Sequence, residues 1–197
     1  MIYLQGVNGL NGLLTCSTDG CGCLIELIAK VIRKHSKIKS GEVRQLGYIS
    51  ELRKKLGTRP IILNTVTVIV FNEQRQLLLQ KRKDTCDWGT IGGVLELGES
   101  LEEAARRELY EEAGLKARTM KFIDVLSGKN MYYKYPNGDE VYFVMAVYEA
   151  DGIEGEPTIN DDEGLELKYF SLDQPIKEMN FMTKKYLKKL GYINQAY

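Results

Sequence analysis

The sequence lacks net charge and long apolar segments, and these two absences disfavour broad classes of partner. Its 27 Lys and Arg residues balance its 27 Asp and Glu residues. A neutral chain has no overall electrostatic attraction to nucleic acid or to an anionic membrane, so nucleic acid is disfavoured as a partner. No apolar run approaches the roughly 20 residues of a membrane span, and we therefore expect no membrane partner.

Cysteine is also scarce, and the few cysteines are unevenly placed. Of the four in the chain, three lie between residues 16 and 23. Such a set does not form the disulfide framework of a small secreted protein. The sequence also lacks the basic, apolar and small-residue segments of a secretory signal. Together these features predict a cytoplasmic protein.

Residues 1–46 differ in composition from the rest of the chain. This segment begins with many Gly, Asn, Ser and Thr residues, and the three clustered cysteines follow. With His35 as the single histidine, the cysteine spacing matches no common zinc pattern, so a zinc site is disfavoured. The remaining alternatives are a poorly ordered extension and an upstream start codon. We expect an N-terminal extension of unclear role over residues 1–46 and one folded domain over residues 47–197.

Apolar patterns predict an α/β fold with a mixed sheet in this domain. Residues 61–71 form a long β-branched run, typical of a strand buried on both faces. A turn sequence at 135–139 joins the two arms of a hairpin. The predicted strands cover 61–71, 76–82, 115–126, the hairpin arms within 130–148, and 165–170, and the predicted helices cover 48–57, 101–113 and 179–190.

The predicted helix at 101–113 carries start and stop signals. Ser100 and Glu103 form a capping box, in which each side chain bonds the backbone N–H of the other residue. Gly114 suits the left-handed position that follows a helix. Between these caps an apolar residue recurs every four positions and forms a buried stripe, which consists of Leu101, Ala105, Leu109 and Ala113.

A second face of this helix carries Glu108, Glu111 and Glu112. Residues three and four apart are neighbours on a helix, so these carboxylates repel one another until a divalent cation binds. Carboxylate oxygens suit Mg²⁺ or Mn²⁺. The preceding Gly92 and Gly93 allow the backbone to approach a ligand closely. The alternative is a solvated acidic face, but a glycine loop before an acidic helix favours a phosphate and metal site.

One segment, residues 93–115, matches the pattern G-x5-E-x7-R-E-U-x-E-E-x-G-U, in which U is an apolar residue. This segment resembles the Nudix box, the signature of hydrolases that act on nucleoside diphosphates linked to another group. The resemblance covers about residues 48–195 and implies a Nudix-type α/β/α sandwich with a mixed β-sheet. It also implies a pyrophosphohydrolase with Mg²⁺ or Mn²⁺ as cofactor, in a family that is often dimeric, so a homodimer is expected.

The same resemblance implies roles for individual residues. The implied metal ligands are Glu108, Glu111, Glu112 and a backbone carbonyl of Gly92 or Gly93. Arg107 is implied to orient the glutamates, and Glu99 to support the loop or the helix. Helical spacing also allows Arg107 to pair with Glu103 and with Glu111.

A general base is needed to deprotonate the attacking water. Glu108 and Glu111 are candidates within the box. Many family members use a glutamate on a loop after the sheet, and the matching loop here, residues 160–166, is acidic. Glu163 is the first choice on this loop and Glu166 the second.

The substrate-binding residues are predicted from weaker signals. Trp88 precedes the glycine loop, where it either stacks on a base or belongs to the core. Arg82 ends a predicted strand and is a candidate contact for phosphate. In family members that cut dinucleoside polyphosphates, a tyrosine follows the box at the distance of Tyr132 and Tyr133. The proline of many ADP-ribose hydrolases is replaced by Asn130, which disfavours that substrate.

The combined expectation is a Mg²⁺-dependent hydrolase that cleaves the pyrophosphate linkage of a nucleoside diphosphate joined to another moiety. The substrate is expected to be a small-molecule nucleotide of nucleotide-sugar, dinucleoside polyphosphate or nucleoside triphosphate type. One alternative is a pyrophosphohydrolase of RNA 5′ ends, which the neutral charge disfavours. Another is a non-catalytic nucleotide sensor with a Nudix fold, which the complete set of box glutamates disfavours.

Overall fold

A computed structural model describes residues 48–135, 137–194 and 197. The predictions for residues 1–46 lie outside these ranges. The helices are α2 (Tyr48–Leu56), α3 (Leu101–Ala113) and α4 (Phe181–Lys189), and a short 3-10 turn, η1, covers Lys129–Met131. The strands are β1 (Ile61–Val70), β2 (Leu77–Arg82), β3 (Trp88–Gly89), β4 (Lys116–Leu126), β5 (Tyr132–Lys134), β6 (Glu140–Glu154) and β7 (Gly164–Phe170). Within the described ranges, no helix has the length and apolar character needed to cross a membrane.

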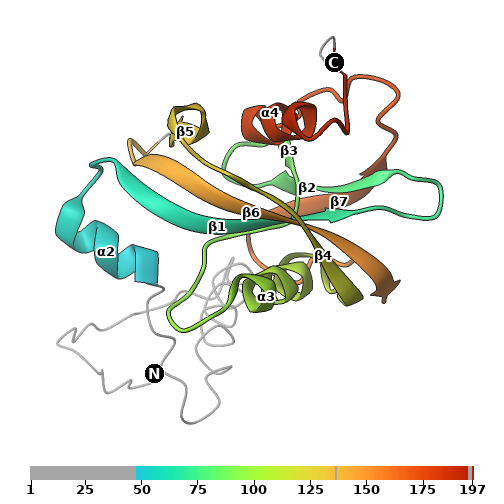
Figure 1. Cartoon of the computed structure of the whole chain (residues 1–197), viewed down its shortest axis with the longest axis horizontal. Coiled ribbons are helices and arrows are strands. Elements are labelled where there is room, and N and C mark those ends of the chain that lie inside the picture. Colours follow the sequence, from blue (N-terminus) through green and yellow to red (C-terminus); the bar gives the residue numbers. More distant parts are fainter. Residues whose placement is uncertain (1–47, 136, 195–196) are drawn as a thin grey trace, which may run out of the picture. The chain divides into compact units, whose positions relative to one another are not determined.

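The strands form two sheets (Figure 1). In the first sheet β6 pairs in parallel with β1 and antiparallel with β4 and β5, which makes this sheet mixed. The second sheet is antiparallel and has the order β3-β2-β7. The predicted mixed sheet is confirmed, and the separate antiparallel sheet is an addition to the prediction.

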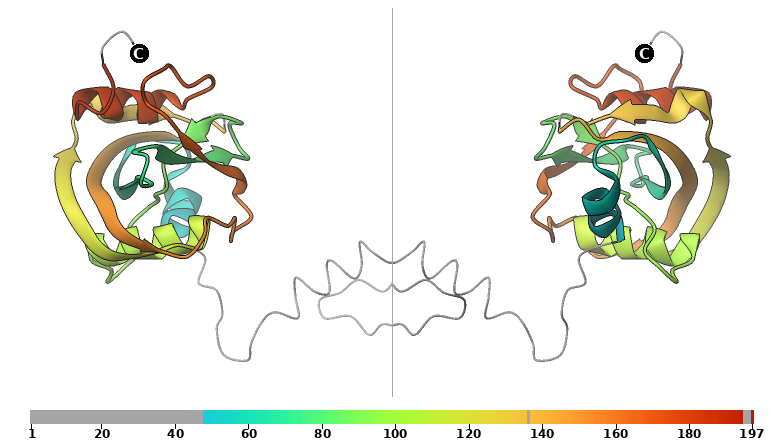
Figure 2. Two further views of the ribbon diagram at one scale, coloured as in Figure 1. Left: turned by 90° about the vertical axis from the view of Figure 1, so that its right-hand side faces the viewer. Right: turned by 90° about the vertical axis from the view of Figure 1, so that its left-hand side faces the viewer.

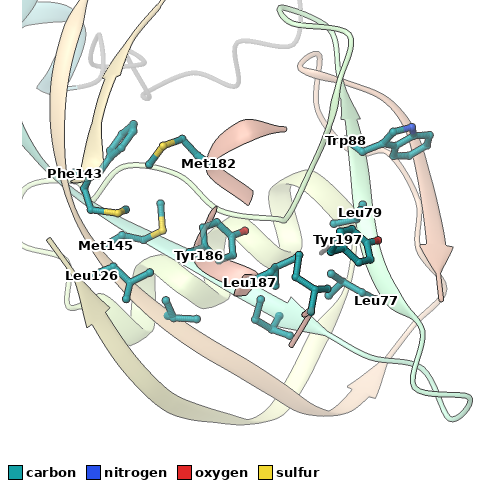
Figure 3. Packing of buried hydrophobic residues seen from close by; sticks show 14 of the residues in the cluster. Leu77, Leu79, Trp88, Leu126, Phe143, Met145, Met182, Tyr186, Leu187 and Tyr197 are labelled. Carbon is teal, nitrogen blue, oxygen red and sulfur yellow. The ribbon is translucent and has the colours of Figure 1, made fainter. Parts of the chain in front are cut away.

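Strand β1 is buried on both faces because its side chains enter two different hydrophobic clusters. Val66, Val68 and Val70 pack with the apolar stripe of α3. Leu63 and Ile69 belong to the other cluster, which side chains of α4 complete (Figure 3). Helices α3 and α4 accordingly lie on opposite sides of the strands (Figure 2). This arrangement explains the unbroken apolar run of β1 and confirms the predicted strand.

The ends of α3 follow the predicted capping. The Ser100 hydroxyl accepts the Glu103 N–H at 3.3 Å, and the Glu103 carboxylate accepts the Ser100 N–H at 2.8 Å. Gly114 has a φ of 67° and donates its N–H to the Tyr110 carbonyl at 2.9 Å. Among the ion pairs of the described residues, none joins Glu103 to Arg107, because the Glu103 carboxylate is used in the cap. The predicted helix bounds are confirmed, and that predicted pair is wrong.

Replacing Ser100 with Ala removes the hydroxyl that caps α3. We expect the free energy of unfolding to fall by about 1 kcal/mol, which lowers the melting temperature of a domain of this size by about 2–4 °C. Differential scanning calorimetry measures the change. Ser100→Thr keeps a capping hydroxyl and is the matched control. An unchanged melting temperature in Ser100→Ala would show that the cap contributes nothing.

Candidate active site

The glycine loop between β3 and α3 lies directly against β1. Val66 donates its N–H to the Gly93 carbonyl at 2.9 Å, and Val68 donates to the Ile91 carbonyl at 2.8 Å. A Cβ atom on Gly92 would lie 2.3 Å from the Val66 carbonyl oxygen, so a larger residue would displace the strand or the loop. The sheet therefore fixes the position of this loop.

Gly93 makes room for a carboxylate of α3. A Cβ atom on Gly93 would lie 2.1 Å from Oε1 and 2.5 Å from Cδ of Glu108. The Glu108 carboxylate consequently rests against the Cα atom of Gly93. A side chain at either of these two positions would therefore clash, at Gly92 with the backbone of β1 and at Gly93 with the Glu108 carboxylate.

The guanidinium of Arg107 joins this loop to the acidic face of α3. Its Nε and Nη2 atoms donate to the two carboxylate oxygens of Glu99, at 2.7 and 3.0 Å. Nη2 also donates to the Val94 carbonyl at 3.0 Å, and Nη1 donates to Glu108 at 2.7 Å and to Glu111 at 3.0 Å. The hydrogen bonds with Glu99 raise the pKa of Arg107 and lower the pKa of Glu99. The predicted pair with Glu111 is confirmed.

Glu112 is the most deeply buried of the box glutamates, with 5% of its surface exposed. Its Oε2 atom accepts the Gly92 N–H at 3.0 Å. Burial raises the pKa of Glu112 to about 8, and the neighbouring Glu108 carboxylate adds to this rise. The Gly92 N–H and the charge of Arg82 oppose the rise without cancelling it. The negative charge of Glu112 is thus poorly compensated within the folded chain.

The acidic loop before β7 lies near the same carboxylates. Asp161 accepts the N–H groups of Glu163 and Gly164, each at 3.0 Å, which closes a tight turn. Burial is the main cause that raises the pKa of Glu108, and the charge of Glu163 adds to it. The charge of Asp161 likewise adds to the rise in the pKa of Glu112. Of the two candidate bases on this loop, Glu163 is therefore electrostatically coupled to the box.

Glu166, the second candidate base, lies within β7 and is exposed. It pairs in register with Lys81 of β2. Its position is that of an ordinary solvated strand residue, which favours Glu163 over Glu166 as the general base.

Arg82 lies at the end of β2, with its guanidinium held by Asp84. Its Nε and Nη2 atoms donate to the two Asp84 oxygens at 3.0 and 2.9 Å. Burial acts to lower the pKa of Arg82, but the hydrogen bonds to Asp84 and the charges of Asp84 and Glu112 raise it above its ordinary value. Arg82 is therefore a partly covered cation near a box glutamate. Sequence reasoning missed Asp84, for which the spacing of two residues from Arg82 is the available signal.

Strand β5 directs its two predicted tyrosines to opposite faces. Tyr133 packs edge-on against Tyr135, with ring centroids 4.8 Å apart. Burial raises the pKa of both tyrosines, and the charge of Arg82 opposes this rise. Tyr132 instead donates its hydroxyl to Glu140 at 2.8 Å. The structure thus brings Tyr133 and Tyr135 near Arg82 and leaves Tyr132 on the other face, as the alternation of side chains along a strand predicts.

Trp88 is a core residue in this structure. It is 7% exposed, and its ring meets Phe170 edge-on with centroids 4.7 Å apart. Of the two interpretations offered by the sequence, the packing favours the core. A base is able to stack on this ring only if the surrounding side chains move.

The carboxylates do not form a ready-made metal cluster. Within the described ranges, no group of three His, Cys, Asp or Glu side chains is arranged to hold a metal ion. Arg107 holds one oxygen of Glu108 and one of Glu111, and Gly92 holds one oxygen of Glu112. The donor set nevertheless fits Mg²⁺ or Mn²⁺, because carboxylate oxygens are hard ligands and a cation beside Glu112 would offset the repulsion from Glu108.

Comparison with known proteins decides the family. The family model described as the NUDIX domain matches residues 62–190, more than half of the chain. The chain belongs to the Nudix family. The matched residues include the glycine loop, α3 and the acidic loop before β7.

The curated relatives that match this chain are named as hydrolases or diphosphatases. The NAD-capped RNA hydrolase NudC of Haemophilus influenzae is 29% identical over 126 residues, which cover 62% of this chain and 44% of the relative. The oxidized purine nucleoside triphosphate hydrolase of Danio rerio is 33% identical over 115 residues, which cover 57% and 69%. A putative 8-oxo-dGTP diphosphatase of Bacillus subtilis is 52% identical over 58 residues, which cover 29% and 39%. The chain spans less than half the length of the NudC relative.

Solved structures confirm the Nudix-type fold. The MutT NUDIX hydrolase from Burkholderia pseudomallei has a TM-score of 0.56 and 26% identity, and the match covers 65% of this chain and 97% of that one. The MutT protein from Methanosarcina mazei Go1 has a TM-score of 0.56 and 17% identity, with 68% and 96% covered. At that identity the second match supports the fold alone.

The raised pKa of Glu112 predicts an unusual dependence of stability on pH. The pKa is about 8 when folded and 4.5 in the absence of the fold, so between these values the folded state holds a proton that the unfolded state has released. The free energy of unfolding in metal-free buffer should therefore fall as the pH rises through this window. Thermal melting from about pH 5 to about pH 8.5 measures this slope.

Glu112→Gln is the control for this pH dependence, because it removes the titrating group and keeps the shape. We expect a shallower slope in the variant than in the wild type. We also expect Mg²⁺ to stabilise the wild type more at high pH than at low pH, because metal ligands bind in their deprotonated form. Identical slopes in the two proteins would contradict the assigned pKa.

Proposed function

We propose that this Nudix protein is a divalent-cation-dependent pyrophosphohydrolase that cleaves a phosphoanhydride of a nucleoside diphosphate derivative. The observation that carries the proposal is the buried Glu112 carboxylate, whose pKa is raised to about 8 beside Glu108. Burying carboxylates without compensation lowers stability, so groups perturbed in this way gather at functional sites. The complete box supports an enzyme over a nucleotide sensor.

Glu108, Glu111 and Glu112 are the proposed metal ligands. A divalent cation at this position would neutralise phosphate charge and lower the pKa of a bound water. Arg107 acts as a positioning residue, because it holds one oxygen of Glu108 and one of Glu111 and so sets the direction of the other oxygen of each. The burial of Glu112 supports a role deeper in the site than that of the exposed Glu111.

Two further contacts are proposed from the loops. The Gly93 carbonyl already accepts the Val66 N–H, which favours the Gly92 carbonyl as the backbone ligand. Glu163, whose charge acts on Glu108, is proposed as the general base that takes a proton from the attacking water. Its place on a turn close to the box supports this role.

The nucleotide itself is proposed to lie beside Arg82. The charges of Glu112 and Tyr135 both act on this guanidinium, so Arg82 is near the box glutamates and near the tyrosine pair. We assign a phosphate contact to Arg82 and a base contact to Tyr133 and Tyr135, whose apolar faces suit stacking. Asp84 fixes the direction of the guanidinium.

A nucleoside triphosphate is the first-choice substrate. The Danio rerio relative and the Bacillus subtilis relative are named for oxidised purine nucleoside triphosphates, and their identities of 33% and 52% exceed that of NudC, over shorter stretches. The second candidate is a NAD-type dinucleotide, because the Haemophilus influenzae relative is named for NAD-capped RNA. The neutral charge of this chain favours a free dinucleotide over an RNA. Cytoplasmic localisation and a homodimer stay predictions.

A substrate panel tests the proposed function. The panel contains the four nucleoside triphosphates, 8-oxo-dGTP, NAD, NAD-capped RNA, dinucleoside polyphosphates, nucleotide sugars and ADP-ribose, each with Mg²⁺, with Mn²⁺ and with EDTA. We expect metal-dependent release of a nucleoside monophosphate, detected by chromatography, and no release with EDTA. Binding of nucleotides without turnover of any of them would support the sensor instead.

Replacing Glu111 or Glu112 with Gln should abolish most of the activity and leave the fold intact. Each variant keeps the side-chain shape but removes a proposed metal ligand, so we expect kcat to fall by at least about 100-fold. Glu102→Gln on the same helix is the matched control, because Glu102 pairs with Arg106 at the surface. Steady-state kinetics and circular dichroism measure activity and fold. Near-normal kcat in both variants would refute the metal site.

A further inference from the structure

Gln80 carries a buried polar group that the described part of the fold does not satisfy. The residue is 2% exposed and lies within β2, between Gly89 of β3 and Leu167 of β7. Its Nε2 atom makes no hydrogen bond to any of the described residues. A buried amide N–H without an acceptor is rare in folded proteins and costs stability. A ligand or water oxygen at this position would satisfy the amide.

The Gln80 side chain shares a face of β2 with Arg82, because side chains alternate along a strand. A Cβ atom on Gly164 would lie 2.7 Å from the Nε2 atom of Gln80, so the amide rests against that glycine. Gly164 directly follows Glu163, the proposed base. A Cβ atom on Gly89 would lie 3.6 Å from Cδ of Arg82. Gly164 thus leaves room for the Gln80 amide, whereas a Cβ atom on Gly89 would only touch Arg82 at an ordinary contact distance.

A cation lies on the same face of β2 as the Gln80 amide. Arg82, two residues along the same face, is a cation coupled to Glu112. A phosphate oxygen held by Arg82 would be an acceptor close to the amide.

We propose that Gln80 is a substrate-binding residue whose Nε2–H donates to a phosphate oxygen of the bound nucleotide, beside Arg82. This inference rests on the proposed function, because it assigns the phosphate subsite of the same reaction. It gives the buried amide its missing acceptor. It also explains why a polar residue stands in a strand whose preceding residues, Leu77, Leu78 and Leu79, are all fully buried.

Gln80→Met tests the proposal, because methionine keeps the length and volume of the side chain and removes the amide. The probe is an α,β-methylene nucleoside diphosphate with Mg²⁺, which binds without being cleaved. We expect its dissociation constant, measured by calorimetry, to rise by about tenfold or more. The melting temperature without ligand should stay the same or rise, because no satisfied hydrogen bond is lost. Gln74→Met, an exposed turn residue, is the matched control.

Side-chain amide NMR gives a second measurement that is independent of turnover. The Gln80 side-chain amide signals, identified by their loss in Gln80→Met, should shift downfield when the analogue binds to the wild-type protein. Gln80→Glu, which keeps the shape and places a negative charge against the phosphate, should weaken binding more than Gln80→Met does. This second variant keeps the test valid if Gln80→Met fails to fold.

The outcomes separate this inference from the proposed function. If the wild type cleaves a nucleotide of the panel and both Gln80 variants keep wild-type affinity and KM, the inference is overturned while the function stands. If the wild type cleaves nothing but both variants lose affinity for the analogue, the subsite stands and the function falls. A wild-type protein that does not bind the analogue also overturns the inference.

Discussion

The geometry of the site depends on the fork of hydrogen bonds around Arg107. One guanidinium binds both oxygens of Glu99 and the Val94 carbonyl in the loop, and it binds Glu108 and Glu111 on the helix. A planar group with donors in fixed directions is able to do this, whereas a single ammonium is not. The glycine loop and the acidic face of α3 are therefore held in one arrangement before any ligand binds.

Close packing of the glycine loop also holds the site in place. Gly92 approaches the backbone of β1, and Gly93 approaches the Glu108 carboxylate, at distances that leave no room for a side chain. The same packing buries Glu112 and raises its pKa to about 8. The fold thus holds carboxylates where their charges are unfavourable to the free protein. A cation and a phosphate are the partners that would make the same charges favourable.

Local signals in the sequence are enough to predict the box helix. Ser100 and Gly114 define its ends through contacts within a few residues, so its bounds are correct to the residue. The assignment of strand faces is different, because it depends on which strands pair. The face of β5 that meets Arg82, and the burial of Gln80, follow from the two-sheet arrangement. Sequence reasoning therefore located the reactive centre but missed much of what surrounds it.

Metal affinity in Arg107→Lys shows whether the guanidinium of Arg107 holds the carboxylates in position for a cation. Lysine keeps the positive charge, so the long-range electrostatics of the site are preserved, but it cannot span the four partners of the guanidinium. Electron paramagnetic resonance of Mn²⁺ measures the dissociation constant in the wild type and in the variant. We expect the affinity to be weaker by about tenfold or more in a variant that remains folded. Wild-type affinity for Mn²⁺ in Arg107→Lys would show that the fork of hydrogen bonds does not position the metal ligands.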